Sequence, residues 1–166
     1  QILIHAVSCG EANTSKPIIK SIELKKKSYL LSIHTPTGYN LSKKFTNNSI
    51  LKPFDTLPTI FYLFYRVKPK ILLIMESDVW LFYILLAKIF RCKIYFFNYL
   101  IKPKKKVRNY LHYLIADKIY VKTKKDVINM KYHYLGNLKL LSTSIVQSNK
   151  KLSETTIIIS SAGKDE

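Results

Sequence analysis

The feature of this sequence that most constrains its fold is a series of short, continuous apolar runs separated by longer segments of helical pattern. Runs that are apolar throughout, rather than at every second residue, are typical of parallel strands covered on both faces. Their alternation with helices predicts a Rossmann-like α/β fold, a right-handed parallel sheet with helices on both faces. The predicted strands are Ile2–Val7, Tyr29–Ile33, Ile71–Met75, Lys93–Phe97 and Lys118–Val121.

The segments between these runs predict the helices and the domain limits. A weaker unit covers Leu41–Leu51, and Tyr132–Leu135 is short and extended. The polar segment 142–154 is typical of a linker, so we expect one domain over 1–141 and the start of a second over 155–166. The predicted helices are Glu11–Lys25, Leu57–Tyr65, Val79–Phe90, a helix that follows the basic run from Lys102 and ends near Ala116, and Lys124–Met130.

The charge of the chain concerns its partners rather than its fold. Its 166 residues include 28 Lys and Arg against 10 Asp and Glu, a net charge of +18. Nucleic acid, an anionic membrane surface and a phosphorylated substrate all fit this surplus, as does a genome-wide composition bias. Because no RNP-type, KH or helix-turn-helix pattern is present, nucleic acid is the least favoured partner. The densest basic run is either a solvated loop or a contact with anionic head groups, and it comprises Lys102, Lys104, Lys105, Lys106 and Arg108.

Several functional classes lack support in the sequence. Two cysteines, Cys9 and Cys92, are too few for a disulfide framework or a cysteine-based zinc site. The four histidines are scattered without metal-ligand spacing, so we expect no metal. His5 inside an apolar run is expected to be either a hydrogen-bonded core residue or a residue that supports a neighbouring site residue. No apolar run reaches about 18 residues, and no signal peptide opens the chain. The abrupt start at Gln1 predicts an excised segment.

Polar residues follow four of the predicted strands at the point where each strand ends. In a parallel sheet all carboxyl ends meet at one edge, where ligands bind. We therefore expect a shared cleft. The residues are Ser8, Gly10 and Glu11 after the first strand, Thr35, Thr37 and Gly38 after the second, Glu76 and Asp78 after a middle one, and Asn98 after the next.

Each of these positions also has a purely structural interpretation. Glu11 lies in the first turn of a helix, where a carboxylate complements the helix dipole whether or not it has a further role. The segment His34–Gly38 is predicted to be a turn, either a connecting loop or a set of hydroxyl and amide groups for a phosphate or sugar. Asp78 suits a helix cap, whereas Glu76 is expected to be partly buried and to need partners. Two carboxylates are too few for a hard cation.

Taken in order, five motifs resemble the N-terminal domain of 3-deoxy-D-manno-octulosonic acid (Kdo) transferases. Ile4–Glu11 is similar to that family's Ile-His-Ala-Val-Ser-x-Gly-Glu, and His34–Gly38 is similar to its Thr-x-Thr-x-Thr-Gly. Pro53–Asp55 resembles its Pro-x-Asp, and Glu76–Trp80 resembles its Glu-Thr-Glu-x-Trp with Asp78 in place of the second Glu. Gly136–Lys139 matches its Gly-Asn-Leu-Lys. The resemblance covers nearly the whole chain.

The resemblance implies the N-terminal half of a GT-B glycosyltransferase without a cofactor. In that family this half holds a lipid A precursor, and the other half holds CMP-Kdo. Kdo is transferred with inversion at the cytoplasmic face of the bacterial inner membrane. Glu11 is then the general base, and the basic run faces lipid phosphates. The substrate-binding residues would be Ser8, Gly10, Thr35, Thr37, Gly38, Glu76, Asp78, Asn98, Asn137 and Lys139.

Departures from the family pattern qualify this expectation. Only the first strand and loop of the donor half are matched, by Ile157–Glu166, and there Ala162 and Gly163 replace the expected Thr and His. The family's N-terminal membrane anchor is not matched either. We therefore expect the 166-residue chain alone to be inactive. The alternative function is a catalytically inactive module of this fold that binds anionic lipid.

Overall fold

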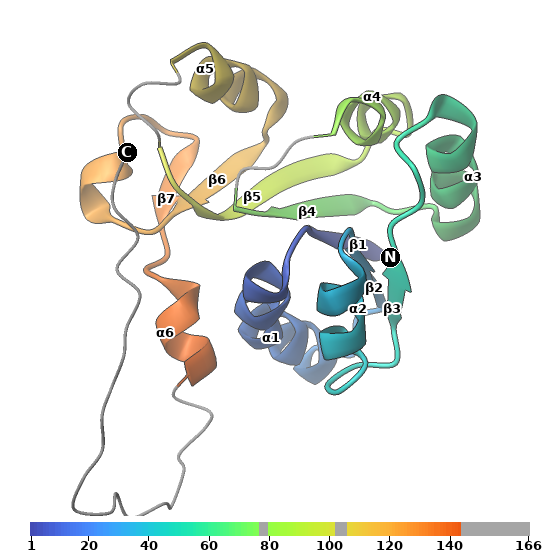
Figure 1. Ribbon diagram of the computed structural model, residues 1–166. Coiled ribbons are helices and arrows are strands. Elements are labelled where there is room, and N and C mark those ends of the chain that lie inside the picture. Colours follow the sequence, from blue (N-terminus) through green and yellow to red (C-terminus); the bar gives the residue numbers. More distant parts are fainter. Residues whose placement is uncertain (77–79, 102–105, 144–166) are drawn as a thin grey trace, which may run out of the picture.

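The computed structural model describes residues 1–76, 80–101 and 106–143 (Figure 1). Within these ranges the chain forms a seven-stranded sheet of order β3-β2-β1-β4-β5-β6-β7, in which every neighbouring pair is parallel. This arrangement confirms the predicted Rossmann-like α/β fold. The strands are β1 (Ile2–Ala6), β2 (Tyr29–Ile33), β3 (Ser49–Leu51), β4 (Ile71–Met75), β5 (Lys93–Tyr99), β6 (Lys118–Val121) and β7 (Tyr132–Tyr134).

Helices cover both faces of the sheet, as the sequence predicts. On one face α1, α2 and α6 enclose a core around Ile4 and Leu31, and on the other α3, α4 and α5 enclose a core around Leu3 and Phe64 (Figure 1). Consecutive strand residues thus enter opposite cores, which explains the continuous apolar runs. The helices are α1 (Cys9–Leu24), α2 (Pro36–Ser42), α3 (Leu57–Val67), α4 (Leu81–Ile89), α5 (Lys106–Ile115) and α6 (Leu138–Thr143), with a 3₁₀ turn at Lys124–Asp126.

The expected turn at His34–Gly38 is wrong in part, because α2 begins inside it. Thr35 is the N-cap, and its Oγ1 accepts a hydrogen bond from the Gly38 backbone N–H at 3.2 Å. Pro36 occupies the first helical position, where its missing N–H costs nothing. Thr37 and Gly38 therefore lie in the first turn of a helix rather than in a loop. The weak unit over Leu41–Leu51 resolves into the end of α2 and strand β3.

Three other predicted elements differ from the structure or lie partly outside it. The helix expected over Lys124–Met130 is wrong, since only Lys124–Asp126 forms a 3₁₀ turn. Helix α6 runs to Thr143, two residues into the expected linker. The rest of that linker and the second-domain segment 155–166 lie outside the described residues, as do 77–79 and 102–105.

His5 is buried in the sheet, but the expectation that it is hydrogen-bonded is wrong. It lies in β1, and neither ring nitrogen has a hydrogen-bond partner. Its ring lies 4.9 Å from that of Tyr83. Burial, followed by the nearby positive charge of Lys52, lowers the pKa of His5 to about 3. The imidazole is therefore neutral in the folded protein at neutral pH.

This burial predicts a pH dependence of stability. Because the folded pKa lies below that of the unfolded chain, the unfolded state binds the proton first. Stability falls as pH drops through the unfolded value of about 6.5. Between pH 7 and pH 5 the contribution of His5 is about 2 kcal/mol. We expect His5→Phe to reduce the pH-dependent loss by about this amount in urea unfolding at pH 5, 6 and 7. A matched substitution of the half-buried His133 in β7, which is not among the groups acting on the pKa of His5, should leave the loss unchanged; an equal effect there would contradict the assignment.

Candidate functional site

The polar residues predicted to share a cleft do gather at the carboxyl edge of the sheet. Ser8 follows β1, Thr35 follows β2, Glu76 follows β4 and Asn98 lies near the end of β5. The first two loops touch each other at Gly38. A Cβ there would lie 2.9 Å from Ile33 Cγ2 and 3.2 Å from the Ser8 carbonyl carbon. Only glycine permits this approach, so Gly38 serves first to pack α2 against the loop after β1.

Glu11 lies in the first turn of α1 as predicted, and local hydrogen bonds fix its position. The Ser8 hydroxyl caps the helix by accepting from the Glu11 backbone N–H at 3.4 Å. In return, Glu11 Oε2 accepts from the Val7 backbone N–H at 2.8 Å. This exchange is close to a capping box, whose sequence signature is Ser-x-x-Glu. Glu11 is only 7% exposed, so its carboxylate is held rigidly at the site.

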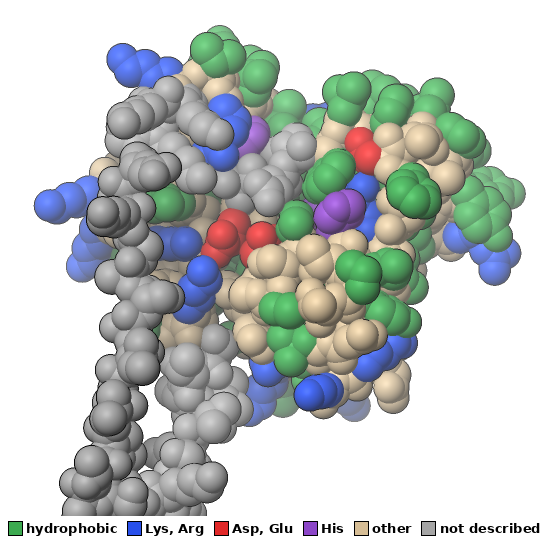
Figure 2. Space-filling model, viewed as in Figure 1, with side chains coloured by type: hydrophobic (Ala, Val, Ile, Leu, Met, Phe, Trp, Pro, Cys, Tyr) green, Lys and Arg blue, Asp and Glu red, His purple; other side chains and the backbone are tan. Residues whose placement is uncertain are grey.

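Glu76 is partly buried and paired, as its sequence position predicts. Its Oε1 lies 3.2 Å from Lys139 Nζ, 3.6 Å from Lys122 Nζ and 3.3 Å from the Asn98 amide nitrogen. The lysines come from α6 and from the end of β6, so the carboxylate joins elements far apart in sequence. Figure 2 shows acidic side chains with basic ones beside them near the middle of this face. We call Glu76, Asn98, Lys122 and Lys139 the Glu76 cluster.

Asn98 connects the Glu76 cluster to the start of α6. It is fully buried, and its side chain donates to Glu76 Oε1 and accepts from the Leu138 backbone N–H at 3.3 Å. Both Glu76 and Asn98 have left-handed backbone conformations, with φ of 58° and 56°. Such values are uncommon outside glycine and concentrate at functional sites. Two adjacent strands therefore carry a left-handed residue, Glu76 directly after β4 and Asn98 near the end of β5, and the two side chains are hydrogen-bonded to each other.

The Gly136–Lys139 segment reaches the site through the hydrogen bond from the Leu138 backbone N–H to the Asn98 side chain. Gly136 has a φ of 82°, which allows the sharp turn before α6. The Asn137 side chain accepts from the Lys139 backbone N–H at 3.0 Å, so its visible role is to shape that turn. Lys139 reaches Glu76, while its side chain stays 51% exposed.

A buried lysine that the sequence did not single out lies at the same edge. Lys52 follows β3, and its side chain is fully buried, with Nζ 4.2 Å from the centre of the Trp80 ring and 3.5 Å from Asp55 Oδ1. Burial lowers the pKa of Lys52, and Asp55 acts in the opposite direction. Asp55 Oδ2 also accepts from the Phe82 backbone N–H at 3.4 Å, at the start of α4. A cation beside an aromatic face is a recognised stabilising contact.

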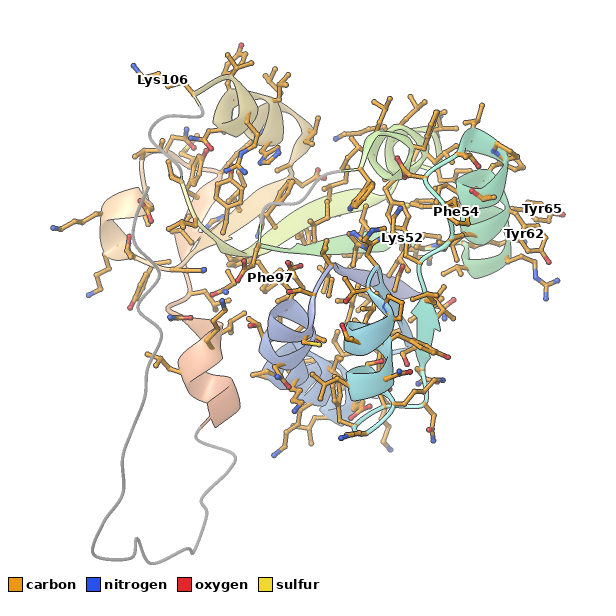
Figure 3. The ribbon with its side chains drawn as sticks, viewed as in Figure 1. Lys52, Phe54, Tyr62, Tyr65, Phe97 and Lys106 are labelled. Carbon is orange, nitrogen blue, oxygen red and sulfur yellow. The ribbon has the colours of Figure 1, made fainter. Side chains whose placement is uncertain are left out.

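The predicted basic run and Asp78 lie apart from this site or outside the residues that the structure describes. Lys106 is exposed on α5 and points away from the sheet edge (Figure 3). Asp78, Lys102, Lys104 and Lys105 lie outside the described residues. Lys122 was missed, although its place directly after a correctly predicted strand is a usable signal. Within the described ranges, no group of three metal-ligating side chains is close enough to hold an ion.

The parallel sheet with polar groups at its carboxyl edge defines a Rossmann-like domain, and comparison with solved structures agrees. A putative UDP-N-acetylglucosamine 2-epimerase from Listeria monocytogenes matches 92% of this chain and 48% of its own, with a TM-score of 0.72. The identity is 12%, so the likeness concerns the fold alone. The chain thus spans about half the length of that structure.

Comparison with models of protein families shows to which family the chain belongs. The model of the family described as 3-deoxy-D-manno-octulosonic-acid transferase (kdotransferase) matches residues 1–140. The chain therefore belongs to the Kdo transferase family, as its motifs predict. A search of curated proteins gives no match. In the described part of the chain, every helix is too short or too polar to cross a membrane.

The geometry of Asn98 yields a stability prediction. Asn98→Gly keeps the left-handed backbone accessible but removes both side-chain hydrogen bonds, which should cost about 1–3 kcal/mol. Asn98→Leu removes the same bonds and adds backbone strain of about 1–2 kcal/mol. We therefore expect the free energy of unfolding in urea to be highest for wild type, lower for Asn98→Gly and lowest for Asn98→Leu. Equal stability of all three would show that neither the bonds nor the conformation matters.

Proposed function

We propose that this chain is the acceptor-binding half of a glycosyltransferase that transfers Kdo from CMP-Kdo to a lipid A precursor, a step of lipopolysaccharide core biosynthesis. The single observation that carries the proposal is the place of Glu11. It occupies the Glu of the family's opening motif, inside the matched range 1–140, and the structure puts it at the carboxyl edge of the sheet. The proposed location is the cytoplasmic face of a bacterial inner membrane.

Glu11 is the proposed general base. Its carboxylate takes the proton from a glucosamine hydroxyl as that oxygen attacks the anomeric carbon of Kdo. The bond from the anomeric carbon to the cytidylate phosphate breaks at the same time, on the opposite side, so the configuration inverts. The leaving phosphate needs no strong acid. The Val7 backbone N–H holds Oε2, which fixes the direction of the carboxylate during proton transfer.

The other predicted residues are proposed to shape the acceptor site. The Ser8 and Thr35 hydroxyl oxygens accept from backbone N–H groups, which leaves each O–H able to donate to a sugar oxygen. The Glu76 cluster is proposed to fix Lys139 beside the cleft, where its exposed side chain meets an anionic group of the acceptor. Gly10, Thr37, Asp78 and Asn137 are the remaining proposed contacts.

If Glu11 is the general base, replacing its carboxylate by an amide should greatly lower kcat. In a full-length enzyme that contains this domain, Glu11→Gln should lower kcat by about 10²–10⁴. Glutamine still fits the capping pattern because its amide oxygen can accept from the Val7 N–H. Helix α1 should therefore remain capped, and acceptor binding should change little. Initial rates of Kdo transfer, measured with the unfolding midpoint of each variant, test this expectation.

Glu11→Ala serves as the matched control, because it removes both the base and the acceptor of the Val7 backbone N–H, while Ser8 remains as the cap. We expect it to lose turnover as Glu11→Gln does and also to lose about 1–3 kcal/mol of stability. If Glu11→Gln keeps turnover within about tenfold of wild type, the base assignment is wrong.

The 166-residue chain alone is expected to transfer no sugar. Within these 166 residues only 157–166 resemble the donor half of the family, so the chain is proposed to lack a complete site for CMP-Kdo. Incubation of the chain with CMP-Kdo and a lipid A precursor should give no Kdo adduct by mass spectrometry. An adduct would contradict this expectation. If full-length protein is also inactive yet binds anionic vesicles, and Lys104–Lys106 are needed for binding while Glu11 is not, the alternative of an inactive lipid-binding module is favoured.

A further inference from the structure

Helices α3 and α4 expose a large apolar surface that the core does not use. The two helices lie side by side on one face of the sheet (Figure 1). Figure 2 shows hydrophobic side chains gathered over them, and Figure 3 shows Tyr62 and Tyr65 pointing away from the sheet. We call this surface the α3–α4 face. Its exposed members are Phe54 (87%), Leu57 (47%), Phe61 (49%), Tyr62 (64%), Tyr65 (57%), Leu81 (71%), Leu85 (44%) and Ile89 (61%).

Helix α3 is apolar on its outer side as well as on the inner side that faces the core. Its inner side, with Ile60, Leu63 and Phe64, fills the core. Its outer side carries further large apolar residues where a surface helix usually has polar ones. A helix that is apolar on all sides is normally enclosed on all sides. A contiguous patch of this kind on an otherwise folded domain marks an interaction site.

The charges around the α3–α4 face indicate the kind of partner. Neither helix contains an acidic residue. Exposed Arg66, Lys68, Lys88 and Arg91 lie in these helices or directly after them. Tyrosine beside cations is typical of the interface between lipid head groups and acyl chains. A second copy of the chain fits less well, because a symmetric contact would bring two such sets of cations together.

An apolar cavity continues the face around the edge of the sheet. It has a volume of about 620 Å³ and lies between β3 and α3, where Ile50, Leu51, Pro53 and Tyr62 line it together with Arg66. A mostly apolar hollow with one cation in its lining suits an acyl chain with an anionic head group.

The α3–α4 face also adjoins the candidate site. Phe54 and Leu81, its two most exposed members, follow the carboxyl ends of β3 and β4. The hydrogen bond from the Phe82 backbone N–H to Asp55 Oδ2 ties these two loops together. The apolar surface thus begins at the same edge of the sheet as Glu11 and the Glu76 cluster.

We propose that the α3–α4 face is the surface by which this domain lies on an anionic phospholipid bilayer. Phe54, Leu81 and the tyrosines enter the head-group layer, and the surrounding cations contact lipid phosphates. This contact is distinct from the basic run at 102–108. It extends the proposed function by naming the membrane-facing side, and it does not depend on catalysis by Glu11.

Vesicle binding tests the proposal with the 166-residue chain. Wild type should co-sediment with vesicles of phosphatidylglycerol and phosphatidylcholine, and weakly with phosphatidylcholine alone. The triple variant Phe54→Ser, Tyr62→Ser and Leu81→Ser should bind the anionic vesicles at least about tenfold more weakly. The matched control, Leu24→Ser with Ile128→Ser and Met130→Ser, removes three apolar side chains that are 76%, 66% and 95% exposed elsewhere. It should bind within about twofold of wild type.

The only tryptophan of the chain gives an independent readout. Trp80 is the N-cap of α4 and precedes Leu81, so its fluorescence reports from the border of the α3–α4 face. Phospholipids brominated on their acyl chains should quench it on binding. Quenching should disappear in the triple variant and persist in Glu11→Gln, which separates this proposal from the catalytic one.

Three outcomes would overturn the proposal. The first is unchanged vesicle binding by a folded triple variant. The second is binding that Lys104–Lys106→Ala abolishes while Trp80 stays unquenched, which would assign the membrane contact to the basic run alone. The third is concentration-dependent dimerisation in analytical ultracentrifugation that the triple variant loses, without vesicle binding by wild type, which would make the face a contact between copies of the chain.

Discussion

The structure depends on the parallel pairing of the central strand β1 with β2 on one side and β4 on the other. The chain runs from β1 outward to β2 and β3, then returns to β4 and continues in the opposite direction. The loops after β1 and β4 therefore leave the sheet edge in opposite directions, and ligands of open α/β sheets bind at such a switch point. Glu11 follows β1 and Glu76 follows β4, so the two carboxylates come from the two loops of the switch point.

Backbone strain at the ends of β4 and β5 adds a second constraint. Glu76 and Asn98 both adopt left-handed conformations, and hydrogen bonds and ion pairs to α6 compensate for that strain. Because Asn98 is fully buried, its two bonds are shielded from competing water. The start of α6 is thereby fixed to the sheet edge by polar contacts rather than by apolar packing alone.

The sequence predicts most of this architecture because burial on both faces imposes continuous apolar runs. Tyr29–Ile33, Ile71–Met75 and Lys118–Val121 match the observed strands at both ends. The turn predicted at His34–Gly38 is wrong in part because Thr35 and Pro36 suit the start of a helix as well as a turn. The left-handed φ of Asn98 and the burial of Lys52 have no local signature; each depends on residues distant in sequence. The places of Glu11 and Glu76 were predictable from strand ends, but the partners of Glu76 required the fold.

The placement of the α3–α4 face has a consequence for how a lipid-borne substrate would arrive. A glycolipid leaves its bilayer only at the cost of exposing its acyl chains to water. An enzyme that acts on its head group is better served by a site that opens at the membrane surface. Phe54 and Leu81 place the apolar face at the edge where the sugar would react. Docking through that face would let the head group reach the loops after β1 and β4 while its acyl chains remain in the bilayer.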